Sequence, residues 1–437
     1  MGRDFSVLQE FKQTGKPPLL GPQTSALPFN QSAFYFYLLF PMFVVSGESL
    51  LSSHYTLLLF YTAIYLFGAF QLRHQFKLRK ILLLTAVMLT IMPQLMAQNR
   101  FVWNPSFLPP LIVATTLTLI WLIHAYSVKK IIFLTSCLSL ALALSYSVAP
   151  FFIAVCLVSI LFFKRRALAI FMGLGVSTLA FQLPTGVFEL RHNFLLTKAL
   201  LAGNFLAQER TGLTEKLHDF SFYFLTDMPI LTGYLIIVSV AVLAIVWWWK
   251  ISVPTHKNQF LLLLWLGGLT LLFSLVFKTS FQAHYIFPLA ISILMIIASM
   301  PDKLYFLYLL FLSTYWLAPA VVSSYWAPAR HNVRELTDCA SNFCQQSAQP
   351  IFVAVQAGYH PYHNGPEFRY LFKRHGCQVK SIETEPQSAR QMALVIDDSS
   401  YEHGKTQFNE LTLLGPSQVM NTFTCSEKLQ IIILQRE

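Results

Sequence analysis

Residues 149–183 read APFFIAVCLVSILFFKRRALAIFMGLGVSTLAFQL, two apolar runs separated by Lys164, Arg165 and Arg166. A membrane-spanning helix needs about 20 mainly apolar residues, and fewer where flanking side chains reach the interface. Each run therefore predicts one span. The basic triplet between them predicts a turn on the cytoplasmic side, because short loops rich in Lys and Arg are retained there.

The composition extends this interpretation to most of the chain. Its 437 residues are 55% hydrophobic and 12% charged, whereas soluble domains carry about 25% charged residues. The net charge of +11 is concentrated in short turns between apolar runs. That placement reflects membrane topology rather than a nucleic-acid partner, so we expect none. The sequence predicts an all-α polytopic membrane bundle.

About ten spans are expected, with juxtamembrane helices beside them. The expected ranges are 55–72, 81–97, 107–126, 131–147, 149–163, 167–183, 230–249, 259–277, 283–299 and 304–321. Every second connection is basic, which predicts that those connections are cytoplasmic. The outer connections are then 98–106, 184–229, 278–282 and everything after residue 321.

Residues 33–47 are apolar and aromatic but short, and they contain Pro41. They either span thinly, which leaves residues 1–30 in the cytoplasm, or lie along the outer interface with residues 1–30 outside. The second alternative is the prediction made here.

The character of the chain changes after residue 322. Apolar runs of strand length occur at 351–355, 392–396 and 429–434, and polar helical stretches such as 367–375 separate them. This alternation predicts a small α/β domain at 323–437, placed outside the cytoplasm by the topology. Residues 1–322 are expected to form the membrane domain, with outer loops at 1–54 and 184–229.

The chain has six cysteines. Cys137 and Cys156 lie in apolar runs and are expected to pack as small hydrophobic residues. The other four fall in the C-terminal domain, where an oxidising compartment favours disulfides. We expect at least one disulfide there, and the three full pairings of those four stay open.

Three outer segments carry charged and aromatic residues. The first is 2–32, whose start predicts an amphipathic helix with Phe5, Leu8 and Phe11 on one face. The second is 99–105, NRFVWNP, and the third is the long loop that opens with FELRHNF at 188–194.

These segments resemble a known superfamily. GRD at 2–4, LLGPQTS at 19–25 and YFYLLFP at 35–41 resemble the first outer loop of GT-C polyprenyl-phosphate-sugar glycosyltransferases, which include protein mannosyltransferases and aminoarabinose transferases. RFVWNPSFLP and FELRHNF resemble later outer loops of its bacterial members. The resemblance implies transfer of a sugar from a polyprenyl phosphate to a lipid, glycan or protein acceptor. The protein would then lie in the bacterial cytoplasmic membrane, among membrane lipids, and act on the outer face.

Such a transfer needs a carboxylate near the acceptor hydroxyl and cationic groups near the departing phosphate. The resemblance assigns the carboxylate to Asp4. Residues for substrate binding are expected to be Arg3, Arg100, Asn104, Glu189, Arg191, His192, His284 and Tyr285. We expect the three outer segments to converge on one outer cavity. The alternative is that they bind separate lipid headgroups at the interface.

The sequence departs from the family pattern at its start. Relatives have a spanning helix, and often D-x-x-R-D, where this chain has only Met1 before Gly2–Arg3–Asp4. At Asn30–Ala33, relatives often carry a His-Gly-Pro or Lys-Pro-Pro step. We expect a truncated or misassigned start, with loss of activity as the alternative. A flippase of lipid-linked sugars is a further alternative. The sequence requires no metal, and a divalent cation stays open.

Overall fold

The computed structural model describes residues 2–23, 30–92, 95–96, 99, 102–201, 212–216, 218–219, 230–251, 254–276, 283–316, 331–347, 349–357, 364–397, 401–402 and 405–437. The chain divides into two compact units. Unit 1 comprises residues 1–16, 48–51 and 328–437, and unit 2 comprises residues 17–47 and 52–327. Each unit is described by itself.

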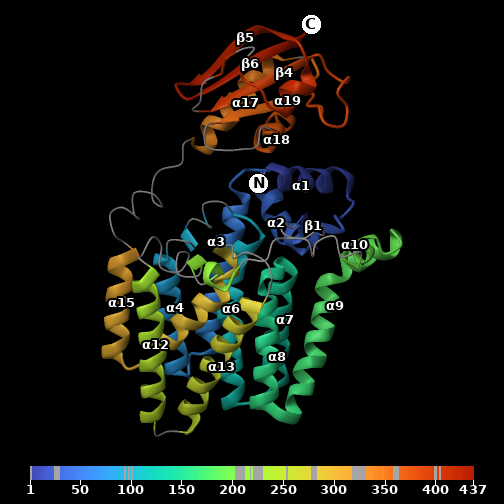
Figure 1. Cartoon of the computed structure of the whole chain (residues 1–437). Coiled ribbons are helices and arrows are strands. Elements are labelled where there is room, and N and C mark those ends of the chain that lie inside the picture. The colour runs from blue at the N-terminus through green and yellow to red at the C-terminus, as the bar shows by residue number, and fades with distance from the viewer. Residues whose placement is uncertain are drawn as a thin grey trace. The chain divides into compact units, whose positions relative to one another are not determined.

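Unit 2 is a helical bundle with one short β-hairpin (Figure 1). Its strands are β1 (Leu20–Gln23) and β2 (Asn30–Ser32). Its α-helices are α2 (Phe34–Val45), α3 (Ser52–Gln71), α4 (Phe76–Ile91), α6 (Leu108–His124), α7 (Val128–Leu144), α8 (Ala149–Phe163), α9 (Ala167–Arg191), α10 (Leu195–Leu201), α12 (Ile230–Lys250), α13 (Pro254–Val276), α14 (Phe287–Ala298) and α15 (Asp302–Trp316). Its 3₁₀ turns are η1 (Asn104–Phe107), η2 (Tyr146–Val148), η3 (Lys164–Arg166) and η4 (Ala283–Tyr285).

A helix occupies the greater part of each of the ten ranges expected to span. Among the described residues, four helical stretches are long and apolar enough to cross a membrane: Ser52–Gln71, Asn104–His124, Tyr146–Arg191 and His256–Val276. The apolar helices Phe34–Val45, Val238–Lys250 and Phe287–Ala298 are shorter. A multi-pass membrane fold is thus confirmed, while the number of ten spans stays a prediction.

The stretch Tyr146–Arg191 contains 46 residues. As one straight helix it would be about 69 Å long, more than twice the ~30 Å hydrocarbon thickness. The chain instead breaks at η3, where Lys164 has a positive φ of 50°. The α8–α9 pair therefore reverses direction at the basic triplet, as the two apolar runs predicted (Figure 1).

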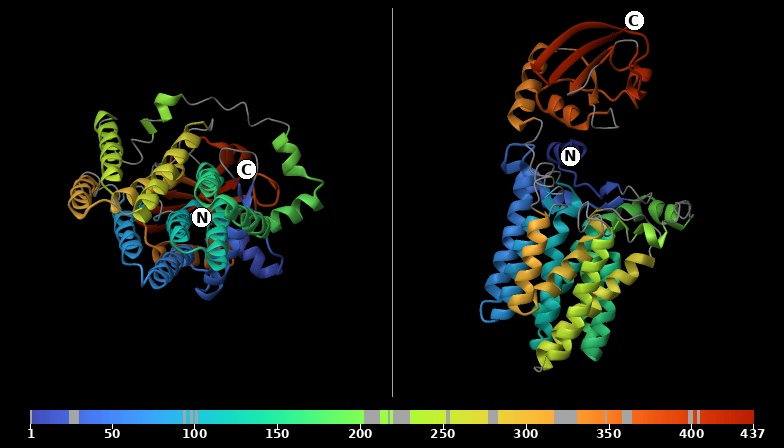
Figure 2. Two further views of the ribbon diagram at one scale, coloured as in Figure 1. Left: turned by 90° about the horizontal axis from the view of Figure 1, so that it is seen from below. Right: turned by 60° about the vertical axis from the view of Figure 1, so that its left-hand side comes forward.

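Helix α6 lies in the middle of unit 2. It contacts α3, α4, α7, α13 and α14. Its residues are apolar on every side and almost all are buried, the pattern of a helix surrounded by other helices. The further views show these helices running side by side (Figure 2).

The two ends of the bundle differ in chemistry. The β1–β2 hairpin and α10 lie at one end, called here the hairpin end (Figure 1). The triplet Lys164–Arg166 and the end of α12 at Lys250 lie at the other, called here the basic end. Helix α2 has 12 residues and Pro41 inside it, so it is about 18 Å long. Its position at an interface stays a prediction.

Unit 1 is an α/β domain. Its helices are α1 (Gly2–Thr14), α17 (Val333–Gln346), α18 (Pro366–Arg374) and α19 (Asn409–Leu414). Its strands are β3 (Ile351–Ala357), β4 (Gln391–Asp397), β5 (Ser417–Ser426) and β6 (Leu429–Arg436), in the order β3-β4-β6-β5. Strands β3 and β4 are parallel, and the other pairs are antiparallel. The three predicted strands and the helix at 367–375 are confirmed.

The core of unit 1 contains Phe352, Leu394 and Leu434 among its fully buried residues. Two disulfides join elements around it: Cys339–Cys425, with Cα atoms 5.3 Å apart, and Cys344–Cys377, with Cα atoms 5.2 Å apart. The expectation of at least one disulfide is confirmed. The described pairing is one of the three that the spacing left open.

Helix α1 belongs to unit 1, which differs from the expected membrane domain of residues 1–322. The reason is its apolar face, since Phe5 and Leu8 are fully buried. The ring of Phe5 lies 5.4 Å from that of Tyr370 in α18. Gly2 comes so close to Pro366 that a Cβ at this position would lie 2.2 Å from the Pro366 carbonyl. The predicted amphipathic helix is confirmed, and its partner is the C-terminal domain.

Candidate functional site

Asn104 begins η1 at the hairpin end and is buried in a polar network. Its Nδ2 donates to Oε1 of Gln31 at 2.5 Å and to the carbonyl of Leu144 at 2.6 Å. These two bonds tie the start of α6 to strand β2 and to the end of α7. Because its amide hydrogens are both used, Asn104 positions neighbouring segments.

His284 lies beside this network in η4. Its ring is 4.8 Å from that of Trp103, in an edge-to-face arrangement, and 4.5 Å from that of Tyr285. The turn η4 also contacts η2. The second outer segment, 99–105, therefore contacts the predicted substrate-binding residue His284 through Trp103, the neighbour of Asn104. We call Gln31, Trp103, Asn104, His284 and Tyr285 the loop cluster.

The end of α9 carries Glu189, Arg191 and His192. The Glu189 carboxylate accepts from the backbone N–H groups of Leu196, at 2.8 Å, and Thr197, at 2.9 Å. A carboxylate at the first turn of a helix satisfies otherwise unpaired N–H groups there. Glu189 therefore fixes α10 against the end of α9.

Arg191 and His192 are both exposed. The His192 ring stacks on Phe188 with a centroid distance of 4.0 Å, and its Nδ1 lies 2.9 Å from the Phe188 carbonyl oxygen. Arg191 thus offers a guanidinium at the hairpin end, with five N–H donors that suit a phosphate.

Strand β2 links the α9 region to the loop cluster. Ser32 Oγ donates to the carbonyl of Phe181 in α9 at 2.6 Å, and the preceding residue Gln31 holds Asn104. Gly21 faces β2 so closely that a Cβ there would lie 2.2 Å from the Ser32 carbonyl oxygen. Strand β2 therefore contacts both Asn104 and α9, the helix whose end carries Glu189 and Arg191.

Asp4 lies in unit 1. It is 7% exposed, and its Oδ1 is 3.4 Å from Nη2 of the neighbouring Arg3, whose side chain is 61% exposed. Arg100 lies outside the described residues. The convergence of all three outer segments on one cavity therefore stays a prediction, while the contact of His284 with Trp103, the neighbour of Asn104, is observed.

Sequence reasoning missed Gln31 and Trp103 as partners of predicted residues. Trp103 was visible inside the second outer segment. Gln31 stood at the position where the sequence departs from the family pattern, and that departure was the available signal. Within the described parts of the chain, no group of three or more His, Cys, Asp or Glu side chains is arranged to hold a metal ion.

These features define a polytopic membrane bundle with a helix-covered α/β domain. Two solved structures share the fold: ArnT from Cupriavidus metallidurans bound to undecaprenyl phosphate, and the same protein in the apo state. The bound form has a TM-score of 0.59 at 12% identity, over 99% of this chain and 93% of that one. The apo form has a TM-score of 0.59 at 13% identity, over 99% and 92%.

ArnT is a GT-C aminoarabinose transferase, so the resemblance inferred from the outer-loop motifs is confirmed at the level of fold. Identity this low shows the fold alone. No family model matches the chain, and no curated protein matches its sequence.

Proposed function

We propose that this protein is a glycosyltransferase that moves a sugar from a polyprenyl-phosphate donor to an acceptor at the outer face of the cytoplasmic membrane. The observation that carries the proposal is the ArnT fold over 99% of the chain. A fold hosts more than one function, so the outer-loop residues supply the second argument.

In this proposal Asp4 is the carboxylate that takes the acceptor proton. Positioned proton transfer of this kind is worth about 10²–10⁴-fold in rate. Arg191 faces the donor phosphate and offsets the negative charge left on it. Arg3, Arg100 and His192 are proposed to add positive charge. His284 and Tyr285 are proposed to contact substrate, and Asn104 and Glu189 to hold the surrounding segments.

The test uses the purified full chain in liposomes that contain a polyprenyl-phosphate sugar labelled in the sugar. Transfer of label to lipid, glycan or protein acceptors supports the proposal. Arg191→Ala should then reduce transfer at least ~100-fold. Asp4→Asn should act similarly without loss of donor binding. Arg165→Ala, an exposed arginine in the η3 turn at the basic end, is the matched control and should transfer normally.

Two outcomes would contradict the proposal. Movement of labelled donor between leaflets without transfer to any acceptor would indicate a flippase. Donor binding without transfer or movement, for every acceptor class, would indicate an inactive relative.

A further inference from the structure

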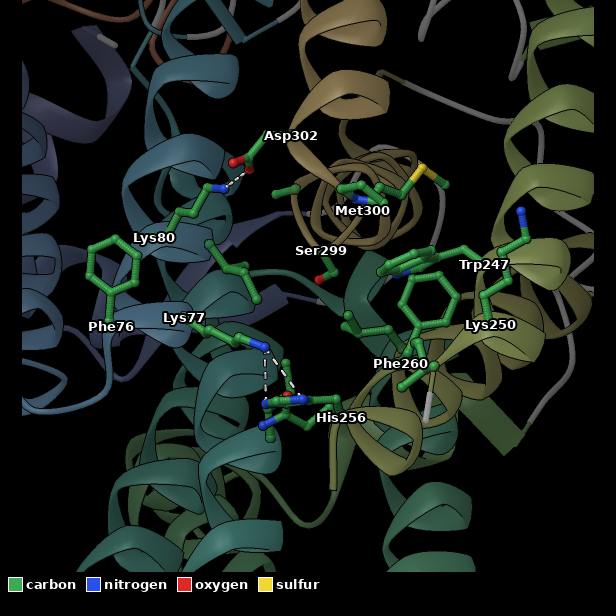
Figure 3. Close-up of a pocket in the computed structure, with 17 residues that line it drawn as sticks. Phe76, Lys77, Lys80, Trp247, Lys250, His256, Phe260, Ser299, Met300 and Asp302 are labelled. Carbon is green, nitrogen blue, oxygen red and sulfur yellow. Dashed lines mark hydrogen bonds and ion pairs between the residues drawn. The ribbon is translucent and has the colours of Figure 1, made fainter. Parts of the chain in front are cut away.

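Unit 2 contains a cavity of about 460 Å³ at its basic end (Figure 3). It lies between α4, α12, α13 and the α14–α15 connection. The residues proposed for glycosyl transfer do not line it. The cavity can therefore have a function separate from the proposed sugar transfer.

The cavity is cationic. Lys77, Lys80 and Lys250 line it together with His256, and Asp302 is the one carboxylate among its described lining residues. Three lysines against one aspartate leave an excess of two positive charges with the histidine neutral. This excess favours an anion.

These cations differ in whether a carboxylate neutralises them. Lys80 forms an ion pair with Asp302. The ammonium of Lys77 instead lies 3.2 Å and 3.3 Å from the two ring nitrogens of His256 (Figure 3). An imidazole does not neutralise a lysine. Lys77 and Lys250 therefore keep charge available for a ligand.

The remaining walls are apolar. Trp247 and Phe260 line the cavity, and Figure 3 shows their rings near Lys250. Phe76 also lines it and is 79% exposed. A small soluble anion would gain no binding free energy from this apolar surface. A phospholipid, in contrast, has a charged headgroup next to apolar chains.

We propose that this cavity binds the phosphodiester headgroup of an anionic phospholipid from the leaflet next to the basic turns. Lys77 from α4 and Lys250 from α12 supply the positive charge that attracts the headgroup, and the apolar wall beside Phe76 takes the start of an acyl chain. Basic pockets between membrane helices on the cytoplasmic side are suited to anionic headgroups. By the positive-inside rule this leaflet is the cytoplasmic one.

The test is a lipid titration of the purified, delipidated full chain in detergent micelles, followed by native mass spectrometry. Phosphatidylglycerol should bind, while phosphatidylcholine should bind at least tenfold more weakly. Lys77→Gln combined with Lys250→Gln should weaken phosphatidylglycerol binding roughly thirtyfold. Both lysines are exposed, so the double variant is expected to fold.

The matched control is Lys129→Gln combined with Lys303→Gln. These two exposed lysines lie in the first turns of α7 and α15, at the same end of the bundle, but do not line the cavity. The control should change binding less than threefold. Equal weakening by both pairs would overturn the proposal, because it would mean attraction to the whole basic surface. Equal binding of phosphatidylcholine would overturn it as well.

Two further measurements separate the sources of the phosphate. Inorganic phosphate and glycerol 3-phosphate should not displace the lipid at tenfold excess, and displacement would indicate a site for soluble anions. Asp302→Asn should tighten phosphatidylglycerol binding about fivefold, because it removes the competing carboxylate. Unchanged or weaker binding would contradict an electrostatic site. No step measures sugar transfer, so the result is independent of the proposed function.

Discussion

Phe5 and Tyr370 lie with their rings 5.4 Å apart inside unit 1, although 365 positions separate them. Phe5 is 1% exposed, and its loss would leave a cavity between α1 and α18. Phe5→Ala should therefore destabilise the docking of α1 by about 3–5 kcal/mol. Limited proteolysis of the full chain should then cut within residues 2–16 much faster than in the wild type.

Gln13→Ala is the control, because Gln13 lies on the exposed side of the same helix. It should leave the cleavage rate unchanged. Equal protection of wild type and Phe5→Ala would mean that the ring contact does not hold α1 in place.

The disulfides give a second prediction. Non-reducing peptide mapping should recover Cys339 with Cys425 and Cys344 with Cys377. The sequence separations are 86 and 33 residues, and closing loops of such lengths stabilises by about 4 kcal/mol each. Reduction should therefore increase hydrogen exchange throughout β3 and β4. A peptide that joins Cys339 to Cys344 would contradict this pairing.

A third prediction concerns pH. His331 joins the start of α17 to the end of β4, with Nε2 2.8 Å from Oδ1 of Asp397 and Nδ1 3.1 Å from Oε1 of Glu335. Burial lowers the pKa of His331, but hydrogen bonds to Asp397 and then Glu335 outweigh it and raise the pKa above its ordinary value. The stabilisation is therefore complete below pH ~6.5 and is lost as the pH rises through the raised pKa.

Hydrogen exchange of β4 should accordingly quicken between pH 6 and pH 9, after correction for the intrinsic pH dependence of exchange. His331→Gln should remove this trend. Lys405→Gln, at an exposed ion pair with Glu402, should retain it. A wild type whose corrected exchange is flat over that range would show that the protonated histidine does not stabilise unit 1.

The fourth prediction separates two neighbours at the end of α9. Glu189→Ala removes the acceptor of the Leu196 and Thr197 N–H groups, a loss of about 1 kcal/mol at a helix start. Exchange of these two amides should rise roughly fivefold. Arg191→Ala should leave that exchange unchanged, because the Arg191 side chain is exposed. A similar rise in both variants would assign Arg191 a structural role.

Elements that repeat a simple apolar pattern could be predicted from the sequence. The helices within the ranges expected to span, and strands β3, β4 and β6, follow from apolar runs of helix or strand length. Strand β5 was missed because it is a largely exposed edge strand, SQVMNTFTCS, without an apolar run. Its pairing with β6 is made by backbone groups that carry no sequence signal.

The site was predicted less completely, for a related reason. Charge alternation indicated which loops share a side of the membrane, but not which side chains meet. The bond from Asn104 to Gln31 and the contact of His284 with Trp103 join residues far apart in sequence. The basic cavity was missed for the same reason, because its cations come from two turns that are far apart in the sequence.

Unit 1 is discontinuous in sequence, since residues 1–16 join residues 328–437. About 300 residues of the chain lie between these two parts. At ~5–20 residues per second, a ribosome needs about 15–60 s to make them. During that interval the Phe5 and Leu8 face of α1 has no Tyr370 to cover it. Unit 1 can therefore complete its folding only after the bundle has been synthesised, and until then the apolar face of nascent α1 lacks its partner.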